Sequence, residues 1–472
     1  MKSTKINFIF NSLYQLTAII VPLITFPYLS RTVGVDGIGD YSFAYSVAYY
    51  FAIFIKLGLN TYGNRTIAYV RNSKDMLSRT FWSLYFFQFI MAVVLLSVYL
   101  IYCTMFALQK GLAFLLIFFV ISSGMDITWM FYGLEEFRII AIRDIFVKIT
   151  TMLAVFAFVK NSNDIWKYTL ILSIGYLLMQ VSVWPLLVKY VYWVIPKKSE
   201  IIEHIKPNLI LFVPTIAVSI YKIMDKIMLG AMISYKEVGY YHSSESIMQV
   251  PMALITSLGT VMLPRVSNMF SVGTSKKVMS SIFGHSIEFA MFLASSMCMG
   301  IMTVAQEFVP LFYGKGFDKC VILYYYLMPS CIFLAFANVI RTQYLIPKKK
   351  DFDFVLSLLI GAMVNLIINI LLIPHFLSIG AAIGTLLAEA SVCIVQTMVV
   401  RKEIPIISYF WNSVPYIVSG IIMFLCFRNY RVVCDNLFIS LIVKFFGGAF
   451  LYVFVLLIGI FIRNRIKMYS SF

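Results

Sequence analysis

The sequence predicts an all-α polytopic membrane protein with about 14 transmembrane helices. Hydrophobic residues make up 61% of the 472 positions and charged residues only 12%, whereas a soluble domain carries about 25% charged residues. The mean hydropathy is +0.89. Apolar runs near the roughly 20 residues that a helix needs to cross a bilayer recur to the end of the chain. The lipid bilayer is therefore the first partner that we expect.

The distribution of basic residues supports this number of spans. The predicted spans are residues 8–29, 41–59, 81–102, 112–131, 145–159, 167–188, 209–231, 239–263, 285–305, 321–340, 354–373, 380–400, 411–427 and 438–461. With the N-terminus inside, the inner segments hold 25 of the 38 Lys and Arg residues, as the positive-inside rule requires. A missed or extra helix would invert this bias from that point onward. We therefore expect both termini to be cytoplasmic.

A repeat at an offset of 200 residues predicts two parallel lobes. The corresponding pairs are Gly39 and Gly239, Tyr41 and Tyr241, and Arg65 and Arg265. In each copy, Gly-x-Tyr opens a predicted helix from the outer side and the arginine closes it at the inner side. The offset spans six predicted helices, and an even number means that both copies cross the membrane in the same direction. Transporters use such parallel repeats to form a central substrate cavity between lobes.

The repeat divides the chain into four parts. We expect an N-terminal lobe of spans 1 to 6 at residues 1–188 and a cytoplasmic inter-lobe linker at 189–208. A C-terminal lobe of spans 7 to 12 follows at 209–400, and spans 13 and 14 with a cytoplasmic tail occupy 401–472. The connections are short, so we expect no domain outside the membrane.

The sequence contains no motif for catalysis. The four histidines form no metal-binding pair, and neither His-Glu-x-x-His nor Gly-x-Ser-x-Gly occurs. A Walker A sequence is also absent, so ATP is not expected as the direct energy source. The net charge of +17 is spread between apolar runs, which argues against a nucleic-acid partner. We therefore expect a transporter without a cofactor or metal, and not an enzyme.

A cluster of charged residues in the seventh span is the first candidate functional site. Lys222, Asp225 and Lys226 fall at i, i+3 and i+4 and share one helix face. A charged residue at the centre of a span costs roughly 2.5–3.5 kcal/mol on insertion scales, so it needs a reason. The lysines can hold an anion such as a phosphate or diphosphate, or they can snorkel to the headgroups. The ion pair between Asp225 and Lys222 is structural, or it opens when a proton or sodium ion binds.

The second span carries another basic candidate on a polar and aromatic face. Tyr45, Tyr49, Lys56 and Asn60 recur at spacings of four, seven and four residues, which places them together on a helix. Lys56 has the same two interpretations as the lysines of the seventh span. Arg31, at the end of the first span, is a further candidate for binding an anion.

Carboxylates inside predicted spans are candidates for ion coupling or gating. They are Asp126, Asp225, Glu245 and Glu389. Glu389 lies near the middle of the twelfth span, and an isolated carboxylate in the membrane is a functional hypothesis by default. Its alternative role is to support the structure of a cavity.

The order and spacing of several motifs resemble those of a known family. The motifs are Asp225-Lys226-Ile227-Met228-Leu229-Gly230, then Glu237-Val238-Gly239-Tyr240-Tyr241, Leu263-Pro264-Arg265, Tyr344-Leu345-Ile346-Pro347 and Gly380-Ala381-Ala382-Ile383-Gly384-Thr385. Over nearly its full length the chain resembles Wzx-type O-antigen and capsule repeat-unit transporters. These flippases belong to the multidrug/oligosaccharidyl-lipid/polysaccharide exporter superfamily.

This resemblance implies a substrate and a mechanism. The substrate would be an undecaprenyl-diphosphate-linked oligosaccharide, moved from the inner to the outer leaflet of the bacterial cytoplasmic membrane for O-antigen or capsule synthesis. The lysines of the second and seventh spans would meet the diphosphate, and the tyrosines and Asn60 of the second span would meet the sugar. We expect alternating access coupled to a proton or sodium gradient. A polysaccharide polymerase and a chain-length regulator are candidate protein partners.

Two alternatives stay open. An exporter of the same superfamily with another substrate, such as a cationic drug or another lipid-linked precursor, is the first, although a drug exporter should prefer acidic groups in its cavity. A polytopic O-antigen polymerase or ligase is the second. Such enzymes carry a large outer loop, and the longest outer segment here, 306–320, is short. The sequence does not identify the sugars, the coupling ion or the oligomeric state.

Overall fold

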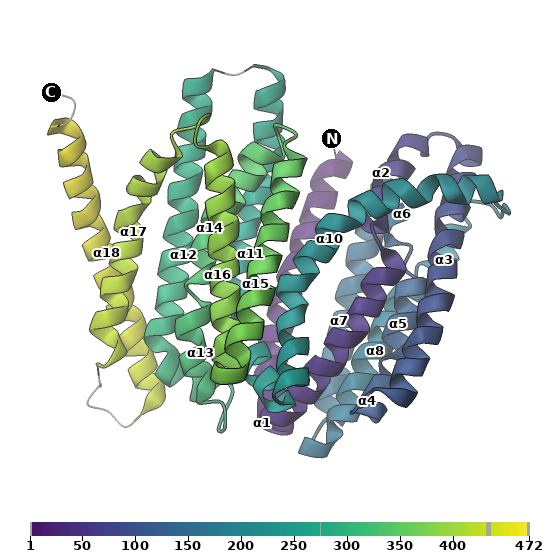
Figure 1. Cartoon of the computed structure of the whole chain (residues 1–472), viewed down its shortest axis with the longest axis horizontal. Coiled ribbons are helices and arrows are strands. Elements are labelled where there is room, and N and C mark those ends of the chain that lie inside the picture. Colours follow the sequence, from purple (N-terminus) through teal and green to yellow (C-terminus); the bar gives the residue numbers. More distant parts are fainter. Residues whose placement is uncertain (1, 274, 431–435, 470–472) are drawn as a thin grey trace. The chain divides into compact units, whose positions relative to one another are not determined.

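The computed structural model describes residues 2–273, 275–430 and 436–469, and within these ranges every regular element is a helix (Figure 1). The chain divides into two compact units, residues 1–230 and residues 231–472. Each unit has its own set of packed helices and is described by itself below. The predicted all-α polytopic membrane fold is confirmed.

Twelve helical segments in the described part of the chain are long and apolar enough to cross a membrane. The first of them, Leu13–Val70, has 58 residues and contains most of the first predicted span and all of the second. The predicted span 145–159 lies mostly in a helix that is not among the twelve, because every 18-residue stretch of that helix carries more than two charged residues. All fourteen predicted spans fall largely in helical chain.

The first unit contains ten α-helices and one short 3₁₀ helix among the described residues. They are α1 (Lys2–Lys56), α2 (Leu59–Val70), α3 (Lys74–Met105), α4 (Lys110–Leu115), α5 (Ile117–Gly124), α6 (Thr128–Gly133), α7 (Phe137–Phe158), η1 (Ser162–Asp164), α8 (Ile165–Val181), α9 (Trp184–Leu187) and α10 (Lys198–Met232). α1 breaks at Gly34, where φ is 71° and ψ is −177°. This break separates the first two predicted spans and reverses the direction of the chain.

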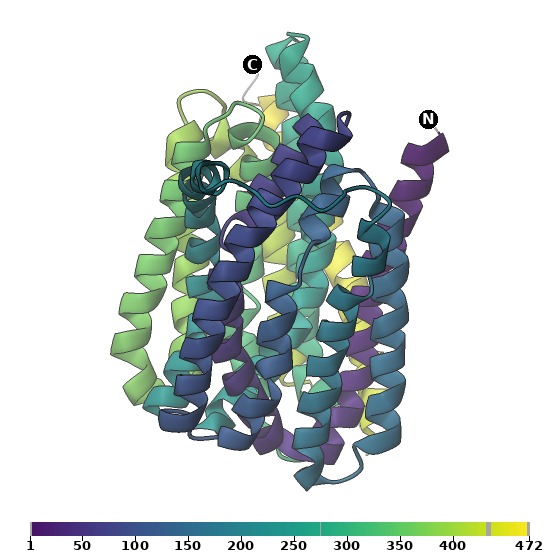
Figure 2. The same ribbon diagram turned by 90° about the vertical axis from the view of Figure 1, so that its right-hand side faces the viewer.

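The last helix of this unit is bent. α10 contains Pro207 and Pro214, which remove backbone hydrogen bonds and kink a helix. Its first part runs across one end of the unit and its second part turns down along the other helices (Figures 1 and 2). The first part includes residues predicted to form the linker, and His204 in it contacts the hydroxyl group of Tyr62 at 2.8 Å. α10 belongs to the first unit as far as Gly230. The predicted lobe boundaries at residues 188 and 209 stay a prediction.

The second unit contains eight α-helices and one π-helical turn among the described residues. They are α11 (Tyr235–Ser271), α12 (Lys276–Phe312), α13 (Lys319–Leu327), α14 (Ser330–Ile340), the π turn η2 (Arg341–Leu345), α15 (Asp351–Phe376), α16 (Ser378–Val400), α17 (Ile406–Arg428) and α18 (Leu437–Tyr469). α15 and α16 form an antiparallel pair, and α17 and α18 pack against α12. The two predicted C-terminal spans thus pack mainly on α12 within the second unit.

The two repeat copies share one local hydrogen bond. The hydroxyl group of Ser46 donates to the carbonyl group of Ser42, and that of Ser246 donates to the carbonyl group of His242, both at 2.7 Å. These positions differ by 200 residues, like the motif residues of the repeat. Tyr41 and Tyr241 are both buried, whereas Arg65 and Arg265 are both exposed. The structural role assigned to the repeat from the sequence stays a prediction.

Candidate functional site

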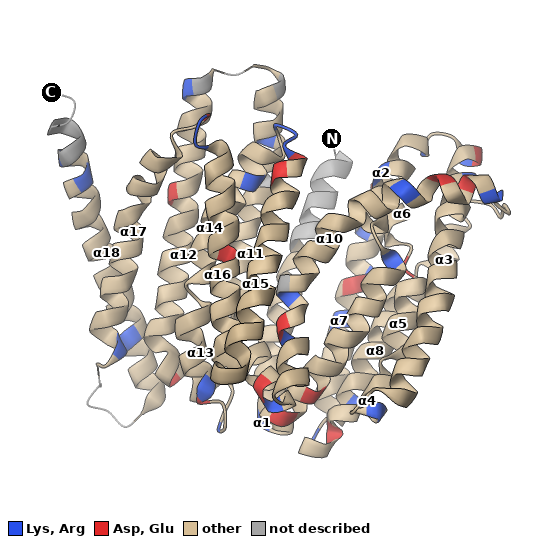
Figure 3. Cartoon of the chain, viewed as in Figure 1, with Lys and Arg blue, Asp and Glu red and all other residues tan. Residues whose placement is uncertain are grey.

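The first unit contains a cavity of about 420 Å³ between α1, α2, α5, α6, α7, α8 and α10. Five tyrosines line it, namely Tyr14, Tyr45, Tyr49, Tyr132 and Tyr176. Five charged residues also line it, namely Lys56, Asp126, Arg143, Asp144 and Lys148. Figure 3 shows charged positions on α7 inside a unit whose helices are otherwise mostly uncharged along their length. A polar cavity within apolar helices is the expected form of a transport site.

Five of the residues selected from the sequence meet at this cavity. They are Tyr45, Tyr49, Lys56, Asn60 and Asp126. The face predicted for the second span therefore exists, and it points into the cavity. Asp126 comes from another predicted span, so the sequence pattern of one helix gave no sign that it would meet Lys56.

Lys56 and Asp126 form an ion pair in the wall of the cavity. The Nζ atom of Lys56 lies 3.2 Å from Oδ2 of Asp126. The side chain of Lys56 is 25% exposed and that of Asp126 only 6%. Lys56 therefore reaches the open space while its partner is held behind it in the wall. This partner explains how the membrane segment tolerates the charge of Lys56.

The position of Asp126 follows from a break in the predicted fourth span. α5 ends at Gly124 and α6 begins at Thr128. Oδ1 of Asp126 accepts hydrogen bonds from the backbone nitrogen of Thr128 at 3.0 Å and from its hydroxyl group at 2.5 Å. A carboxylate at this place satisfies a free N–H group at the start of the helix. The broken helix thus fixes the carboxylate that orients Lys56.

Gln88 of α3 holds the same break from the other side. Its Nε2 atom donates to the carbonyl groups of Ser123 at 2.8 Å and Asp126 at 2.9 Å, and its Oε1 atom accepts from the indole of Trp129 at 3.1 Å. Gln88 is fully buried. In a membrane segment, irregular backbone needs such internal partners, because lipid offers none. No pattern in the sequence indicated this role for Gln88.

α7 supplies charged residues that were not among the candidates chosen from the sequence. The predicted span 145–159 leaves Arg143 and Asp144 in the preceding inner segment and puts Lys148 in its first turn. The helix begins at Phe137, so these residues lie well inside it. The spacing of Asp144 and Lys148 at i and i+4 was the available signal, since it places both on one helix face.

Arg143 and Lys148 are incompletely neutralised. The Nη2 atom of Arg143 lies 2.6 Å from Oδ1 of Asp144, and Nε donates to the same oxygen at 2.8 Å. The Nη1 atom of Arg143 is buried without a hydrogen-bond partner among the described residues. Nζ of Lys148 lies 4.2 Å from the centre of the Tyr14 ring, a cation–π contact that leaves its N–H groups available. The cavity therefore offers strong donors to an anion.

The charged cluster of the seventh span does not line this cavity. Lys222 is exposed, whereas Asp225 is fully buried and Lys226 is 7% exposed. Thr215, two turns before Lys222 on α10, does line the cavity. The binding role of Lys222 and Lys226 and the coupling role of Asp225 stay predictions.

The remaining candidates lie elsewhere. Arg31 is exposed near the break in α1, and its Nη1 atom lies 3.4 Å from the carbonyl oxygen of Pro27. Glu245 is half-buried on α11, and Glu389 is 7% exposed on α16. The cavity of the first unit includes none of these three. Their predicted roles are untested by this geometry.

Comparison with protein families gives a match that covers more than half of the chain. A model of the family described as "Polysaccharide biosynthesis protein" matches residues 5–270. A protein of Escherichia coli strain K12 named "Putative O-antigen transporter" is 24% identical over 409 residues, which cover 85% of this chain and 97% of that protein.

Solved structures share the fold. Lipid II flippase MurJ in an inward closed conformation superposes with a TM-score of 0.75 at 17% sequence identity, covering 97% of this chain and 100% of that chain. An inward-facing multidrug resistance MATE family transporter of the MOP superfamily has a TM-score of 0.58 at 12% identity, covering 83% of this chain and 99% of that chain. At these identities the likeness concerns the fold alone.

Proposed function

The chain belongs to the polysaccharide biosynthesis protein family, and on this basis we propose that it flips an undecaprenyl-diphosphate-linked oligosaccharide from the inner to the outer leaflet of the bacterial cytoplasmic membrane. The resemblance to Wzx-type flippases of the MOP superfamily, drawn from sequence motifs, is confirmed at the level of the family. A flippase for lipid-linked glycans, rather than an enzyme, is what this family and fold support. The carrier lipid, the direction and the energy source belong to the proposal.

The donors of Arg143 and Lys148 are the observation that carries the proposal. A diphosphate has several charged oxygens close together, and a guanidinium group can bind two of them at once. Nη1 of Arg143 has no protein partner among the described residues, and Nζ of Lys148 lies over the face of a tyrosine ring. Lys56 adds a third cation, which Asp126 holds in place. These groups favour a substrate with a compact negative charge.

The tyrosines of the cavity provide the surface for a sugar. The rings of Tyr45 and Tyr49 have centres 6.0 Å apart, and those of Tyr45 and Tyr176 are 6.3 Å apart. Aromatic faces pack against the C–H groups of a sugar ring, while hydroxyl and amide groups reach its hydroxyls. Asn60 and the side chain of Gln180, whose buried Oε1 atom has no partner among the described residues, supply such amides. The lipid tail would remain in the bilayer.

We propose that the carboxylates of the cavity couple transport to a cation gradient. Asp126 and Asp144 each pair with a cation that a diphosphate would also bind. An arriving diphosphate competes with these carboxylates, and a carboxylate that loses its cation can take up a proton or a sodium ion. This exchange links substrate binding to ion binding without a separate site. It supports alternating access driven by a proton or sodium gradient.

The cavity disfavours export of cationic drugs. Its three basic residues outnumber its two acidic residues, and both carboxylates are already paired. A cationic compound would have to break one of these pairs. An anionic lipid-linked precursor meets no such obstacle, so this alternative differs from our proposal only in the identity of the glycan.

We propose the cytoplasmic membrane as the location, with both termini in the cytoplasm, from the bias of 25 of the 38 basic residues toward the predicted inner segments. A polysaccharide polymerase and a chain-length regulator are the protein partners that we propose from the family. Co-purification of the full chain with each candidate from native membranes tests this point. Accessibility of single cysteines at the two termini tests the orientation.

Transport in proteoliposomes tests the function directly. The full chain is reconstituted with an undecaprenyl-diphosphate oligosaccharide that carries a fluorophore, and a membrane-impermeant quencher reports the leaflet in which the fluorophore lies. We expect faster exchange between leaflets than in protein-free liposomes. Replacement of the diphosphate by a neutral ether linkage should abolish this exchange. Equal exchange of the neutral analogue would overturn the proposed diphosphate site.

The variants Lys148→Ala and Arg143→Ala locate the site. We expect each to lower the rate at least roughly ten-fold, because each removes a charge-assisted hydrogen bond to the diphosphate. Lys110→Ala is the matched control, since Lys110 is an exposed lysine of the same unit outside the cavity. Lys222→Ala separates the two predicted sites: loss of transport in this variant alone would move the diphosphate site to α10.

A further inference from the structure

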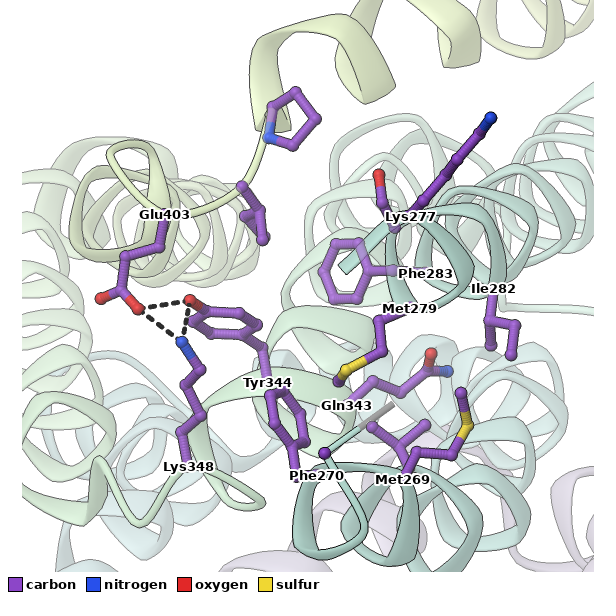
Figure 4. Close-up of a pocket in the computed structure, with 15 residues that line it drawn as sticks. Met269, Phe270, Lys277, Met279, Ile282, Phe283, Gln343, Tyr344, Lys348 and Glu403 are labelled. Atoms are coloured by element: carbon purple, nitrogen blue, oxygen red, sulfur yellow. Dashed lines mark hydrogen bonds and ion pairs between the residues drawn. The ribbon is translucent and has the colours of Figure 1, made fainter. Parts of the chain in front are cut away.

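The second unit has its own cavity, at one end of the helix bundle. It has a volume of about 510 Å³, within the range of about 300–1,000 Å³ typical of pockets for small molecules. The end of α11, the start of α12, the π turn η2 and residues 403–405 form its walls (Figure 4). The cavity belongs to this unit alone and is separate from the proposed transport site.

A buried glutamine without a partner lies in this cavity. Gln343 is 2% exposed, and neither its Nε2 nor its Oε1 atom has a hydrogen-bond partner among the described residues. Figure 4 shows its side chain between Met269 and Met279. Buried amides are normally hydrogen-bonded, so an exception needs an explanation. Gln343 lies in the π turn η2, and such turns often occur at functional sites.

The walls around Gln343 are apolar. They include Phe270, Met279, Ile282 and Phe283. Lys348 also borders the cavity, but its Nζ atom is held by Glu403 at 2.6 Å and by the hydroxyl group of Tyr344 at 2.7 Å. Free sugars and nucleotides do not suit such walls. The fitting ligand has an apolar chain and one uncharged group that hydrogen-bonds to an amide.

Basic residues lie at the rim of the cavity and next to lining residues in the sequence. Lys277 lies at the rim and is exposed (Figure 4). Lys349, Arg401 and Lys402 are exposed on the two connections beside it. Basic clusters next to membrane helices attract the headgroups of anionic lipids. The fitting ligand therefore also carries a negative charge, which lies at the mouth of the cavity.

Aromatic residues indicate that the cavity lies at the level of the headgroups. α17 begins directly after Pro405 of the cavity wall, and Trp411 in its second turn is 64% exposed. Tryptophan is enriched where membrane and water meet. Phe410 beside it is also exposed. A lipid of the surrounding bilayer is therefore within reach of the cavity.

We propose that this cavity binds an anionic glycerophospholipid. One acyl chain lies between the aromatic and methionine side chains, and the amide of Gln343 donates to the ester carbonyl group. The phosphate lies near Lys277 at the rim. The site does not depend on what the first unit transports, because none of its residues lines the transport cavity.

Native mass spectrometry of the delipidated full chain tests the proposal. The protein is titrated with dioleoyl phosphatidylglycerol and, separately, with dioleoyl phosphatidylcholine. We expect at least one phosphatidylglycerol molecule to bind with roughly ten-fold higher affinity than phosphatidylcholine, and Gln343→Leu to remove roughly ten-fold of that affinity, as the loss of one hydrogen bond does. Gln249→Leu is the matched control, since Gln249 is an exposed glutamine of the same unit.

Further variants separate the contributions of the headgroup and of the acyl chain to lipid binding. Lys277→Ala should reduce the preference for phosphatidylglycerol over phosphatidylcholine, and Met279→Trp should fill the cavity and prevent binding of both. Gln343→Leu removes an unpaired polar group from apolar surroundings, so it should fold at least as well as the native chain. Equal binding by Gln343→Leu and Gln249→Leu would overturn the proposal. Retention of the lipid by Met279→Trp, or its displacement by an equal concentration of undecaprenyl phosphate, would overturn it as well.

Discussion

Lys444 and Glu307 form a buried ion pair that joins α18 to α12. The Nζ atom of Lys444 lies 2.7 Å from Oε1 of Glu307, and the two side chains are 1% and 9% exposed. The hydroxyl group of Ser440 donates to the same oxygen at 3.2 Å. Two charges out of water stabilise a structure only while both are present. The pair thus fixes the position of α18 along the axis of α12.

Loss of one partner of this pair should strongly destabilise the folded chain. We expect Lys444→Ala to destabilise the folded chain by about 3–5 kcal/mol, because it leaves the carboxylate of Glu307 buried without its cation. The double variant Lys444→Leu with Glu307→Leu should recover most of this loss, since no charge then remains buried. Melting temperatures in detergent measure both effects.

A second ion pair between the same helices serves as the control. Nη1 of Arg463 lies 3.2 Å from Oε1 of Glu288, with side chains 18% and 24% exposed. Because this pair is better solvated, Arg463→Ala should lower the melting temperature less than Lys444→Ala. An equal effect of the two substitutions would contradict the assigned importance of burial.

Gln88 should control the position of Asp126. Gln88→Leu removes the four hydrogen bonds that the Gln88 side chain makes at the break between α5 and α6. Each buried group left without a partner costs about 1–3 kcal/mol, so both the melting temperature and the transport rate should fall. Gln109→Leu is the control, since Gln109 makes one hydrogen bond, to Asp40 at 3.2 Å. If Gln88→Leu transports like Gln109→Leu, the break does not position the cavity.

The sequence predicted the spans well because crossing a membrane requires long apolar runs. It also predicted the polar face of the second span, because helical spacing alone brings Tyr45, Tyr49, Lys56 and Asn60 together. It placed the start of α7 too late, because the adjacent charges of Arg143 and Asp144 are typical of a loop when hydropathy is the criterion. Inside the bundle, Arg143 is paired with Asp144, and Lys148 lies over the ring of Tyr14.

Contacts between distant segments could not be predicted in the same way. Asp126 meets Lys56 only because α5 and α6 are separate helices, and hydropathy shows residues 112–131 as one continuous run. Gln343 lies three residues beyond the predicted span 321–340, and only the fold shows that its amide is buried. Helical spacing describes one face of one helix, whereas a site forms where several helices meet.

Gly34 should be essential to the reversal within α1. Its φ of 71° with ψ of −177° belongs to a region that is almost restricted to glycine. No atom lies within 4 Å of the position that the Cβ atom of an alanine would take here, so the backbone alone sets the cost of Gly34→Ala, which we expect to be about 1–3 kcal/mol. Gly111→Ala is the control, because Gly111 in α4 has equally open surroundings and no positive φ. A melting temperature of Gly34→Ala equal to that of Gly111→Ala would contradict this account.

Glu403 should make the stability of the second unit depend on pH in a defined window. Hydrogen bonds from Lys348, Lys350 and Tyr344, in that order of importance, lower the pKa of Glu403 from 4.5 to about 2. Residues 401–405 connect α16 and α17 outside both helices, so solvent protons reach this carboxyl group.

The direction of the effect follows from the lowered pKa. A carboxylate whose pKa is lower in the folded state stabilises that state above its unfolded pKa, here 4.5, and the stabilisation is lost as the pH falls toward 2. The melting temperature of the native chain should therefore decrease between pH 4.5 and pH 2 by more than that of Glu403→Gln, which cannot ionise. Other carboxyl groups titrate in the same window, so the difference between the two proteins is the quantity to measure. Parallel curves of melting temperature against pH for the two proteins would show that the contacts of Glu403 add nothing to stability.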